Sequence, residues 1–202
     1  MGIEKVKFYR INLITNKDKD YGGFINHYEP YQEIRDFRKT NKNFIKFSNT
    51  PIVFERDKSY KNDKPISDFL VTNWSELIVS ERIYKMLKEK YSNEIDFYEC
   101  FAKDENVLKP YFILRAKNKI DVLDKSLYPK IDFDLGVMRS VLIDDISKEY
   151  NYFDVLYGSR MVISKQLYEE LKAMTPTNFE VTPIMTTSEE LKAREKNLSK
   201  IN

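Results

Sequence analysis

The sequence predicts an α+β fold in a single domain, with a mostly antiparallel or mixed sheet and a few packed helices. A length of 202 residues suits one domain. The composition, 42% hydrophobic and 33% charged residues, is that of an ordinary globular protein. Strand-like segments outnumber helical ones, and most follow one another without an intervening helix. That order favours an α+β fold over a doubly wound parallel sheet.

The first part of the chain carries short strand-like segments separated by loops. Residues 5–13 are rich in β-branched and aromatic side chains and predict a first strand. Residues 16–23 predict a loop, and an aromatic-rich segment follows at 24–37. Two short apolar runs, 44–47 and 52–54, flank a turn-like Asn-Thr-Pro and suggest a hairpin.

The middle of the chain predicts a strand, a helix and a second strand in succession. Residues 77–79 form a short apolar run, and Ser80 follows as a favourable helix N-cap. Ile83, Leu87 and Tyr91 recur at helical spacing, so the helix is expected to reach Tyr91. The segment 95–101 returns to a strand pattern.

The same plan recurs 84 residues later. LIVSERIYKMLK at 77–88 aligns without a gap with MVISKQLYEELK at 161–172, and the Ser, Tyr, Leu and Lys positions are identical. Ser164 is then the second N-cap, and 179–184 is the closing strand. Internal duplication would explain this likeness, and so would convergence of two capped helices on similar residues. Both explanations remain open.

Further strands are expected at 111–115, 120–123 and 138–143. The tail opens with a capping box from Thr187 to Glu190 but has few large apolar residues, so we expect a marginal, frayed helix. The expected organisation is therefore one α+β domain over 1–185, in which 1–65 and 66–185 are distinct parts, followed by a helical tail over 186–202.

Charge and cysteine content restrict the class of protein. The chain has 34 basic and 32 acidic residues, so no strongly basic surface for nucleic acid is expected. No run of about 18 apolar residues occurs, so no membrane span is expected. The single cysteine, Cys100, favours a reducing compartment. We therefore expect a cytoplasmic protein, and the abundance of residues with AT-rich codons points to a bacterium.

Residues suited to chemistry are few. Structural zinc needs four His or Cys ligands, and the chain holds only His27 and Cys100. A catalytic Cys–His pair would require these two to meet, whereas Cys100 lies in a strand pattern typical of a buried, inert thiol. No cofactor motif is present, so we expect no catalytic residues, no metal ligands and no cofactor.

Three acidic pairs between residues 121 and 145 could nevertheless hold a hard cation. The pairs are Asp121 with Asp124, Asp132 with Asp134, and Asp144 with Asp145. Acidic pairs at strand ends more often act as turn or helix caps, which is the interpretation we favour.

The best candidate for a partner-binding surface is an aromatic cluster that begins in the first loop. It comprises Tyr21, Phe24, His27, Tyr28 and Tyr31, and it surrounds and follows two glycines. Aromatic residues are enriched at protein interfaces. The alternative is that these side chains fill one end of the hydrophobic core.

Six short segments, in this order, resemble a known bacterial family. They are ISDFL at 66–70, LIVSERI at 77–83, YFILRA at 111–116, IDVLDKS at 120–126, MVISKQL at 161–167 and FEVTPI at 179–184. The pattern is similar to the immunity proteins of polymorphic toxin systems (immunity family eleven), first catalogued as a domain of unknown function. This resemblance implies a cytoplasmic protein that binds and blocks a cognate toxin, and it implies no catalytic residues.

The sequence thus favours a non-enzymatic protein that inhibits its partner by stoichiometric binding. Two other functions remain open. One is a small metal-dependent enzyme that uses the acidic pairs, and the other is a regulatory subunit that binds a non-toxin protein. The oligomeric state and the binding surface are not predicted.

Overall fold

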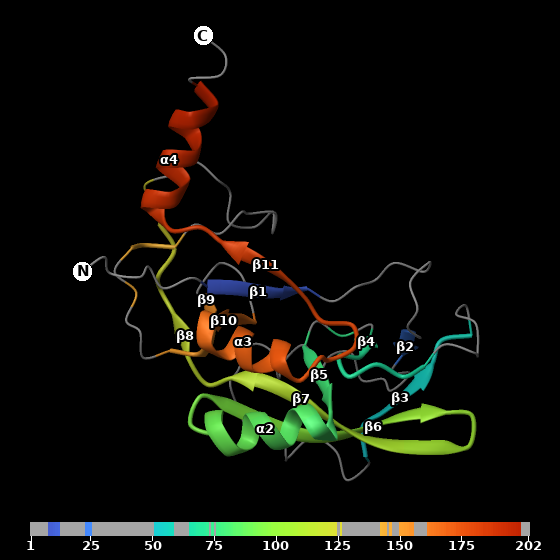
Figure 1. The fold of residues 1–202 in the computed structure, drawn as a ribbon. Helices are drawn as coiled ribbons and strands as arrows, with labels where there is room; N and C mark the ends of the chain where they lie inside the picture. The colour runs from blue at the N-terminus through green and yellow to red at the C-terminus, as the bar shows by residue number, and fades with distance from the viewer. Residues whose placement is uncertain are drawn as a thin grey trace. The chain divides into compact units, whose positions relative to one another are not determined.

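The computed structural model confirms the α+β class. It describes residues 8–12, 23–25, 51–58, 65–72, 74, 76–124, 126, 142–144, 146, 150–155 and 161–198. Within these ranges the chain forms two mixed sheets and three helices (Figure 1). Most strands pair antiparallel, and three pairs are parallel.

The chain divides into two compact units, and each sheet belongs to one of them. Unit 1 comprises residues 1–12, 116–175 and 180–202, and unit 2 comprises residues 13–115 and 176–179. The expectation of a single domain over 1–185 with an internal boundary at residue 65 stays a prediction.

Unit 2 is built on a six-stranded sheet with one helix. In sheet order its strands are β4 (Val71–Thr72), β2 (Gly23–Ile25), β3 (Val53–Arg56), β6 (Ile95–Asp104), β7 (Val107–Ala116) and β5 (Leu77–Ser80). Helix α2 (Glu81–Tyr91) follows β5 directly and ends at the residue that its apolar spacing predicts. It buries Ile83, Leu87 and Tyr91, one apolar face of the helix.

The core of unit 2 lies on the sheet face that alternates with the face under α2. Phe54, Cys100 and Ala102 occupy alternate positions of β3 and β6 and are fully buried. Trp74 packs edge-on against Phe54, with ring centroids 5.1 Å apart. Period-two alternation of these strands therefore separates a packed core face from an opposite face that only α2 covers.

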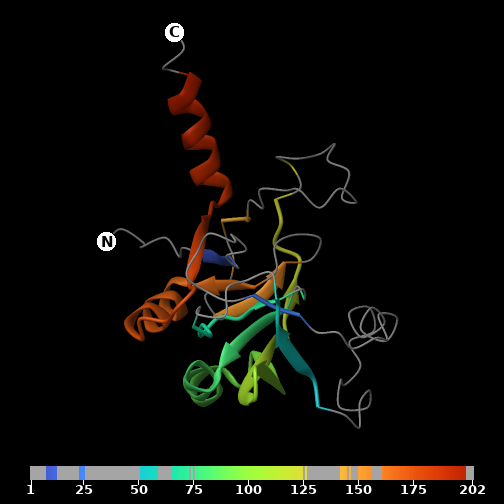
Figure 2. The same cartoon turned by 90° about the vertical axis from the view of Figure 1, so that its right-hand side faces the viewer.

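Unit 1 is built on a five-stranded sheet with two helices. In sheet order its strands are β11 (Glu180–Ile184), β1 (Phe8–Asn12), β10 (Val162–Ser164), β9 (Tyr152–Val155) and β8 (Lys119–Ile120). Helix α3 (Lys165–Ala173) follows β10, and α4 (Thr187–Leu198) follows β11 and leads away from the sheet (Figures 1 and 2).

Strand β1 is central to unit 1 although it lies near the start of the chain. It pairs antiparallel with β10 on one side and with β11 on the other. Phe8 and Ile11 are buried, and Phe8 packs edge-on against Phe153 in the core of the unit. The sequence predicted this strand, but its two partners are more than 150 residues away along the chain.

Both units contain the same split β-α-β arrangement. In unit 2, β5, α2 and β6 are consecutive, and β7 lies between the two strands, antiparallel to β5. In unit 1, β10, α3 and β11 are consecutive, and β1 lies between them, antiparallel to both. The strand that closes unit 2 follows β6 through a two-residue turn, whereas the one that closes unit 1 comes from the opposite end of the chain.

The likeness extends to individual side chains at the same 84-residue offset. Tyr84 of α2 stacks on Phe112, the pairing partner of Val79, and Tyr168 of α3 stacks on Tyr9, the pairing partner of Ile163. A lysine four residues further along each helix lies over the tyrosine ring: Lys88 over Tyr84 at 5.2 Å, and Lys172 over Tyr168 at 5.6 Å.

The flanking segments repeat as well. The Ser80 N–H donates to the carbonyl of Asp68 and its hydroxyl to the carboxylate; Ser164 makes the same two bonds to the carbonyl and side-chain oxygen of Asn151. Phe54 pairs in parallel with Ala102, and 84 residues beyond Ala102 a parallel bridge joins Leu142 to Thr186. The units therefore share one plan with a permuted strand order, which favours duplication over convergence.

Some details differ from the expectations. Ser80 is at the N-cap position, but its side chain makes no cap bond, because the hydroxyl donates to Asp68 instead. Ser164 does cap its helix by accepting from the Leu167 N–H. The reciprocal bond of the predicted capping box lies one residue earlier, from the Thr186 N–H to Glu189. The strand expected at 120–123 is only Lys119–Ile120.

Candidate protein-binding face

One half of the sheet in unit 2 lacks a cover on the face that carries α2. Tyr84 of α2 contacts Phe97 of β6 and Phe112 of β7, so these two residues mark that face. Alternation then places Phe101 of β6 and Leu108 and Pro110 of β7 on the same face, further from the helix. The face continues across the sheet beyond the N-terminal end of α2.

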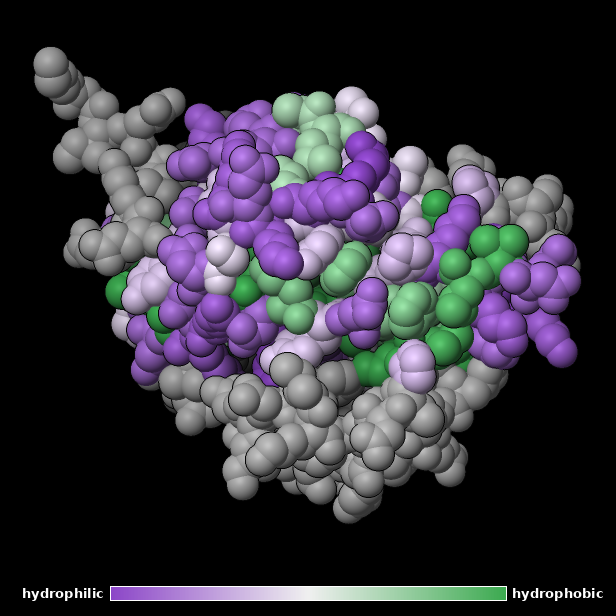
Figure 3. Space-filling model, turned by 90° about the horizontal axis from the view of Figure 1, so that it is seen from below, coloured by the Kyte–Doolittle hydropathy of each residue, from purple (hydrophilic) through white to green (hydrophobic). Residues whose placement is uncertain are grey.

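We call the apolar residues of this region the hairpin face: Val53, Phe101, Leu108 and Pro110. Val53 belongs to it because it pairs directly with Phe101. The side chain of Leu108 is 52% exposed, Pro110 is exposed, and Val53 and Phe101 are half-buried. Figure 3 views the side of the molecule that carries α2 and shows apolar side chains gathered over the hairpin end of the strands.

The hairpin presents this surface because β6 and β7 are each ten residues long. Their turn is short, with Glu105 in the left-handed region at φ 50°. The first four residues of β7 are all exposed, including Val107 at 53%. Large apolar side chains side by side at a strand end are unfavourable in water, because each gains about 25 cal/mol per Å² when it is covered.

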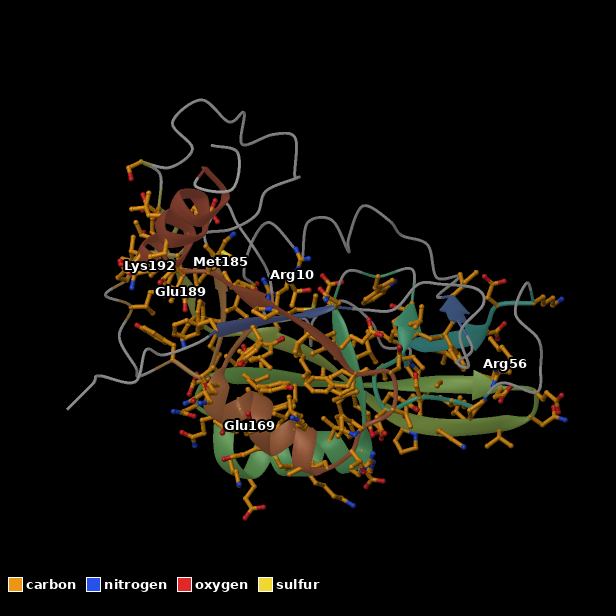
Figure 4. The ribbon with its side chains drawn as sticks, turned by 45° about the horizontal axis from the view of Figure 1, so that its top comes forward. Arg10, Arg56, Glu169, Met185, Glu189 and Lys192 are labelled. Carbon is orange, nitrogen blue, oxygen red and sulfur yellow. The ribbon has the colours of Figure 1, made fainter. Side chains whose placement is uncertain are left out.

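Charged side chains around the hairpin face are paired within the protein. Lys103 and Glu55, which lie on this face, form an ion pair at 2.8 Å. On the opposite face Arg56 binds Asp104 with two nitrogens and lies over the ring of Phe24. The hydrogen bond from Arg56 lowers the pKa of Asp104. Figure 4 shows Arg56 at the hairpin end of the unit.

Asp68 holds the N-terminal end of α2, which borders the hairpin face. It accepts two bonds from the guanidinium of Arg82, one from the Ser80 hydroxyl, and two from the N–H and hydroxyl of Thr177. Burial raises the pKa of Asp68, but these hydrogen bonds outweigh it and hold the pKa well below its ordinary value. Asp68 is thus an ionised structural anchor, a role that the sequence did not suggest.

The aromatic cluster predicted as an interface is described at one position only. Phe24 is 1% exposed and belongs to the core of unit 2. It offers no side-chain surface there, in line with the alternative that it fills the core. Tyr21, His27, Tyr28 and Tyr31 lie outside the described residues, so their part in binding stays a prediction.

Two of the acidic residues considered for a cation hold the start of α4. Asp124 accepts from the hydroxyl of Thr187 and from Ser126, and Asp144 accepts from the N–H and hydroxyl of Ser188. These are cap interactions, as favoured from the sequence. Asp132, Asp134 and Asp145 lie outside the described residues, and Asp121 is described but lies in no grouping of metal-binding side chains. Across the described ranges no three His, Cys, Asp or Glu side chains are so grouped.

Cys100 is fully buried in the core of unit 2. Burial, with a smaller contribution from Glu99, raises the pKa of its thiol far above the ordinary value. The thiol is therefore protonated and shielded, as its strand pattern predicts. His27, the other half of the hypothetical Cys–His pair, is not among the described residues.

The sequence contained a signal for the hairpin face that the strand assignment overlooked. The strand was expected to begin at Tyr111, but β7 begins at Val107. The adjacent apolar pair Val107-Leu108 breaks the alternation typical of a strand with one solvated side. Period-two patterns show that a strand has two faces, but they do not show where a helix stops covering one of them.

A scan against protein-family models finds no match to this chain, and a search of curated proteins finds none either. Where the structure describes the chain, it contains no helix with the length and apolar character needed to cross a membrane.

Proposed function

We propose that this protein binds another protein through the hairpin face and inhibits it by occupancy, without catalysis. The observation that carries the proposal is the uncovered apolar surface formed by Phe101, Leu108 and Pro110 beside α2. Exposed apolar surface with a polar surround is typical of a protein-interaction site. Leu108 would be its central anchor, since a few buried apolar side chains supply most of the binding energy of an interface.

The proposed role is that of an immunity protein that neutralises a cognate bacterial toxin in the cytoplasm. This part rests on the resemblance of residues 66–184 to immunity family eleven, for which the family scan offers no support. A regulatory subunit that binds a non-toxin protein would use the same surface. The two roles differ only in the identity and activity of the bound partner.

A matched pair of variants tests the binding surface. Leu108→Asp places a charge on the hairpin face, and Leu191→Asp places one on α4, where Leu191 is 45% exposed. Both leucines are exposed, so each change should alter the free energy of unfolding by less than about 0.5 kcal/mol. In affinity purification from the native organism, we expect one chain to co-purify with the wild type and with Leu191→Asp.

The same chain should be lost with Leu108→Asp, because a buried unpaired charge is strongly unfavourable at an interface. Equal recovery with both variants would contradict the assignment of the hairpin face. The activity of the recovered chain then decides the role. A chain that stops growth when it is expressed alone, and is harmless with this protein, identifies a toxin and its immunity protein.

A further inference from the structure

The hairpin face also indicates which element of the partner it receives. We infer that the occupant is a single amphipathic α-helix of a partner protein, with an apolar and uncharged face, laid on the sheet beside α2. This inference rests on the proposed function and adds the shape and chemistry of the bound segment. Three features of unit 2 support it.

The first feature is the position of the strands within the sheet. β3, β6 and β7 are interior strands, with β2 beyond β3 and β5 beyond β7. Each of the three is hydrogen-bonded to a neighbour on both sides, so none can accept an added strand from a partner. A partner must therefore bind the hairpin face through side chains, as a helix or a second sheet does.

The second feature is the size of the face. From Val53 on β3 to Leu108 on β7 the face spans three strands, or about two spacings of 4.8 Å. This width of about 10 Å matches the diameter of one helix. Five residues of β6, from Glu99 to Lys103, extend about 16 Å, which about eleven helical residues cover. A partner sheet would need a wider face, and α2 already occupies the adjoining part.

The third feature is the charge around the face. Lys103 pairs with Glu55 on the face itself. On the adjoining end of α2, Lys85 pairs with Glu81 and Arg82 pairs with Asp68. These charges compensate one another, so the surface has no strong field of either sign. A complementary segment is therefore apolar and near neutral, and its binding should depend little on salt.

Site-specific photocrosslinking in the native organism tests this inference with the full-length protein. A benzophenone amino acid replaces Leu108 in one variant and Pro110 in a second, so that a folding defect in one does not decide the result. Leu191 carries the same group in the control. We expect the first two variants to crosslink to one partner peptide, with apolar residues at spacings of three, four and seven, and the control not to.

A synthetic copy of the crosslinked peptide provides the second readout. Its circular dichroism should become helical when the wild-type protein is added, and should not change with Leu108→Asp. Its affinity should change less than about threefold between 50 and 500 mM NaCl, far less than for a charged interface.

The outcomes separate this inference from the proposed function. A peptide that binds in a non-helical form, or an affinity that falls steeply with salt, overturns the helix and leaves protein binding in place. Crosslinking only to a second copy of this chain overturns a foreign occupant. Crosslinking to no protein from either Leu108 or Pro110 overturns the proposed function itself.

Discussion

At the scale of single residues, Asp68 is the most connected polar side chain of unit 2. It joins the segment before β4, the start of α2 and the short segment 176–179 through five hydrogen bonds. The sequence shows only an acidic residue in a short apolar run. Its importance depends on Thr177, 109 residues away, and no local pattern predicts that contact.

Asp68→Asn should lower the free energy of unfolding by about 2 kcal/mol, because it weakens several hydrogen bonds to a charged acceptor. The matched control is Glu81→Gln, which removes a charge from an exposed ion pair with Lys85 and should cost less than about 0.5 kcal/mol. Urea denaturation of both variants at pH 7 gives the comparison. Equal costs would contradict the anchor role.

The contribution of the Asp68 charge should also depend on pH with a defined sign. Its pKa is lower in the folded than in the unfolded state, so the stabilisation is complete above the unfolded value of about 4 and is lost below it. The difference in stability between the wild type and Asp68→Asn should therefore be constant from pH 7 to about 5. It should shrink as the pH falls towards the lowered folded pKa. A difference that grows on acidification would contradict the assignment.

Ser80 and Ser164 occupy equivalent positions but should behave differently in double-mutant cycles. Ser164→Ala removes a true cap bond and should cost about 1 kcal/mol in any background. Ser80→Ala removes only a bond to Asp68, so its cost should largely disappear in an Asp68→Ala background. Unfolding measurements on the four single and double variants provide the test. A Ser80→Ala cost that persists without Asp68 would indicate a cap bond after all.

At the scale of elements, local patterns predicted which segments form strands and helices better than how those segments pair. The helix over Glu81–Tyr91 and the strand beginning at Ile95 match the sequence expectation closely. The pairing of β1 between β10 and β11 could not be predicted, because hydrophobic periodicity contains no information on distant partners. For the same reason the sequence suggested the wrong part of β7 as its start and overlooked the hairpin face.

The position of β1 predicts an unusual sensitivity to truncation. Removal of residues 1–12 should abolish hydrogen-exchange protection in β10 and β11, because both lose their central neighbour and the buried Phe8 and Ile11. Ending the chain after Glu190 should leave that protection intact, since it keeps the capped start of α4 and none of the described side chains removed is buried. Retained protection without residues 1–12 would contradict the topology.

At the scale of the whole molecule, two units share one arrangement of strands around a capped helix, and their differences indicate where function resides. In unit 2, β6 continues into β7 through the hairpin that displays Leu108. In unit 1, the equivalent position beyond β11 leads into α4, with Met185 exposed at its base (Figure 4). The sequence revealed the repeat of strand, serine and helix. The exchanged closing strands became evident only from the pairing.

The central claim is that the protein inhibits a partner by covering it through the hairpin face, and titration of the purified partner by this protein tests it most directly. We predict a sharp endpoint at one fixed molar ratio, with a negative heat-capacity change from buried apolar surface. Leu108→Asp should weaken binding at least about a hundredfold, the equivalent of about 2.7 kcal/mol. The double variant His27→Ala with Cys100→Ala should keep the endpoint wherever it remains folded. Inhibition that persists at one molecule per hundred partner molecules, or that survives Leu108→Asp unchanged, would contradict the account.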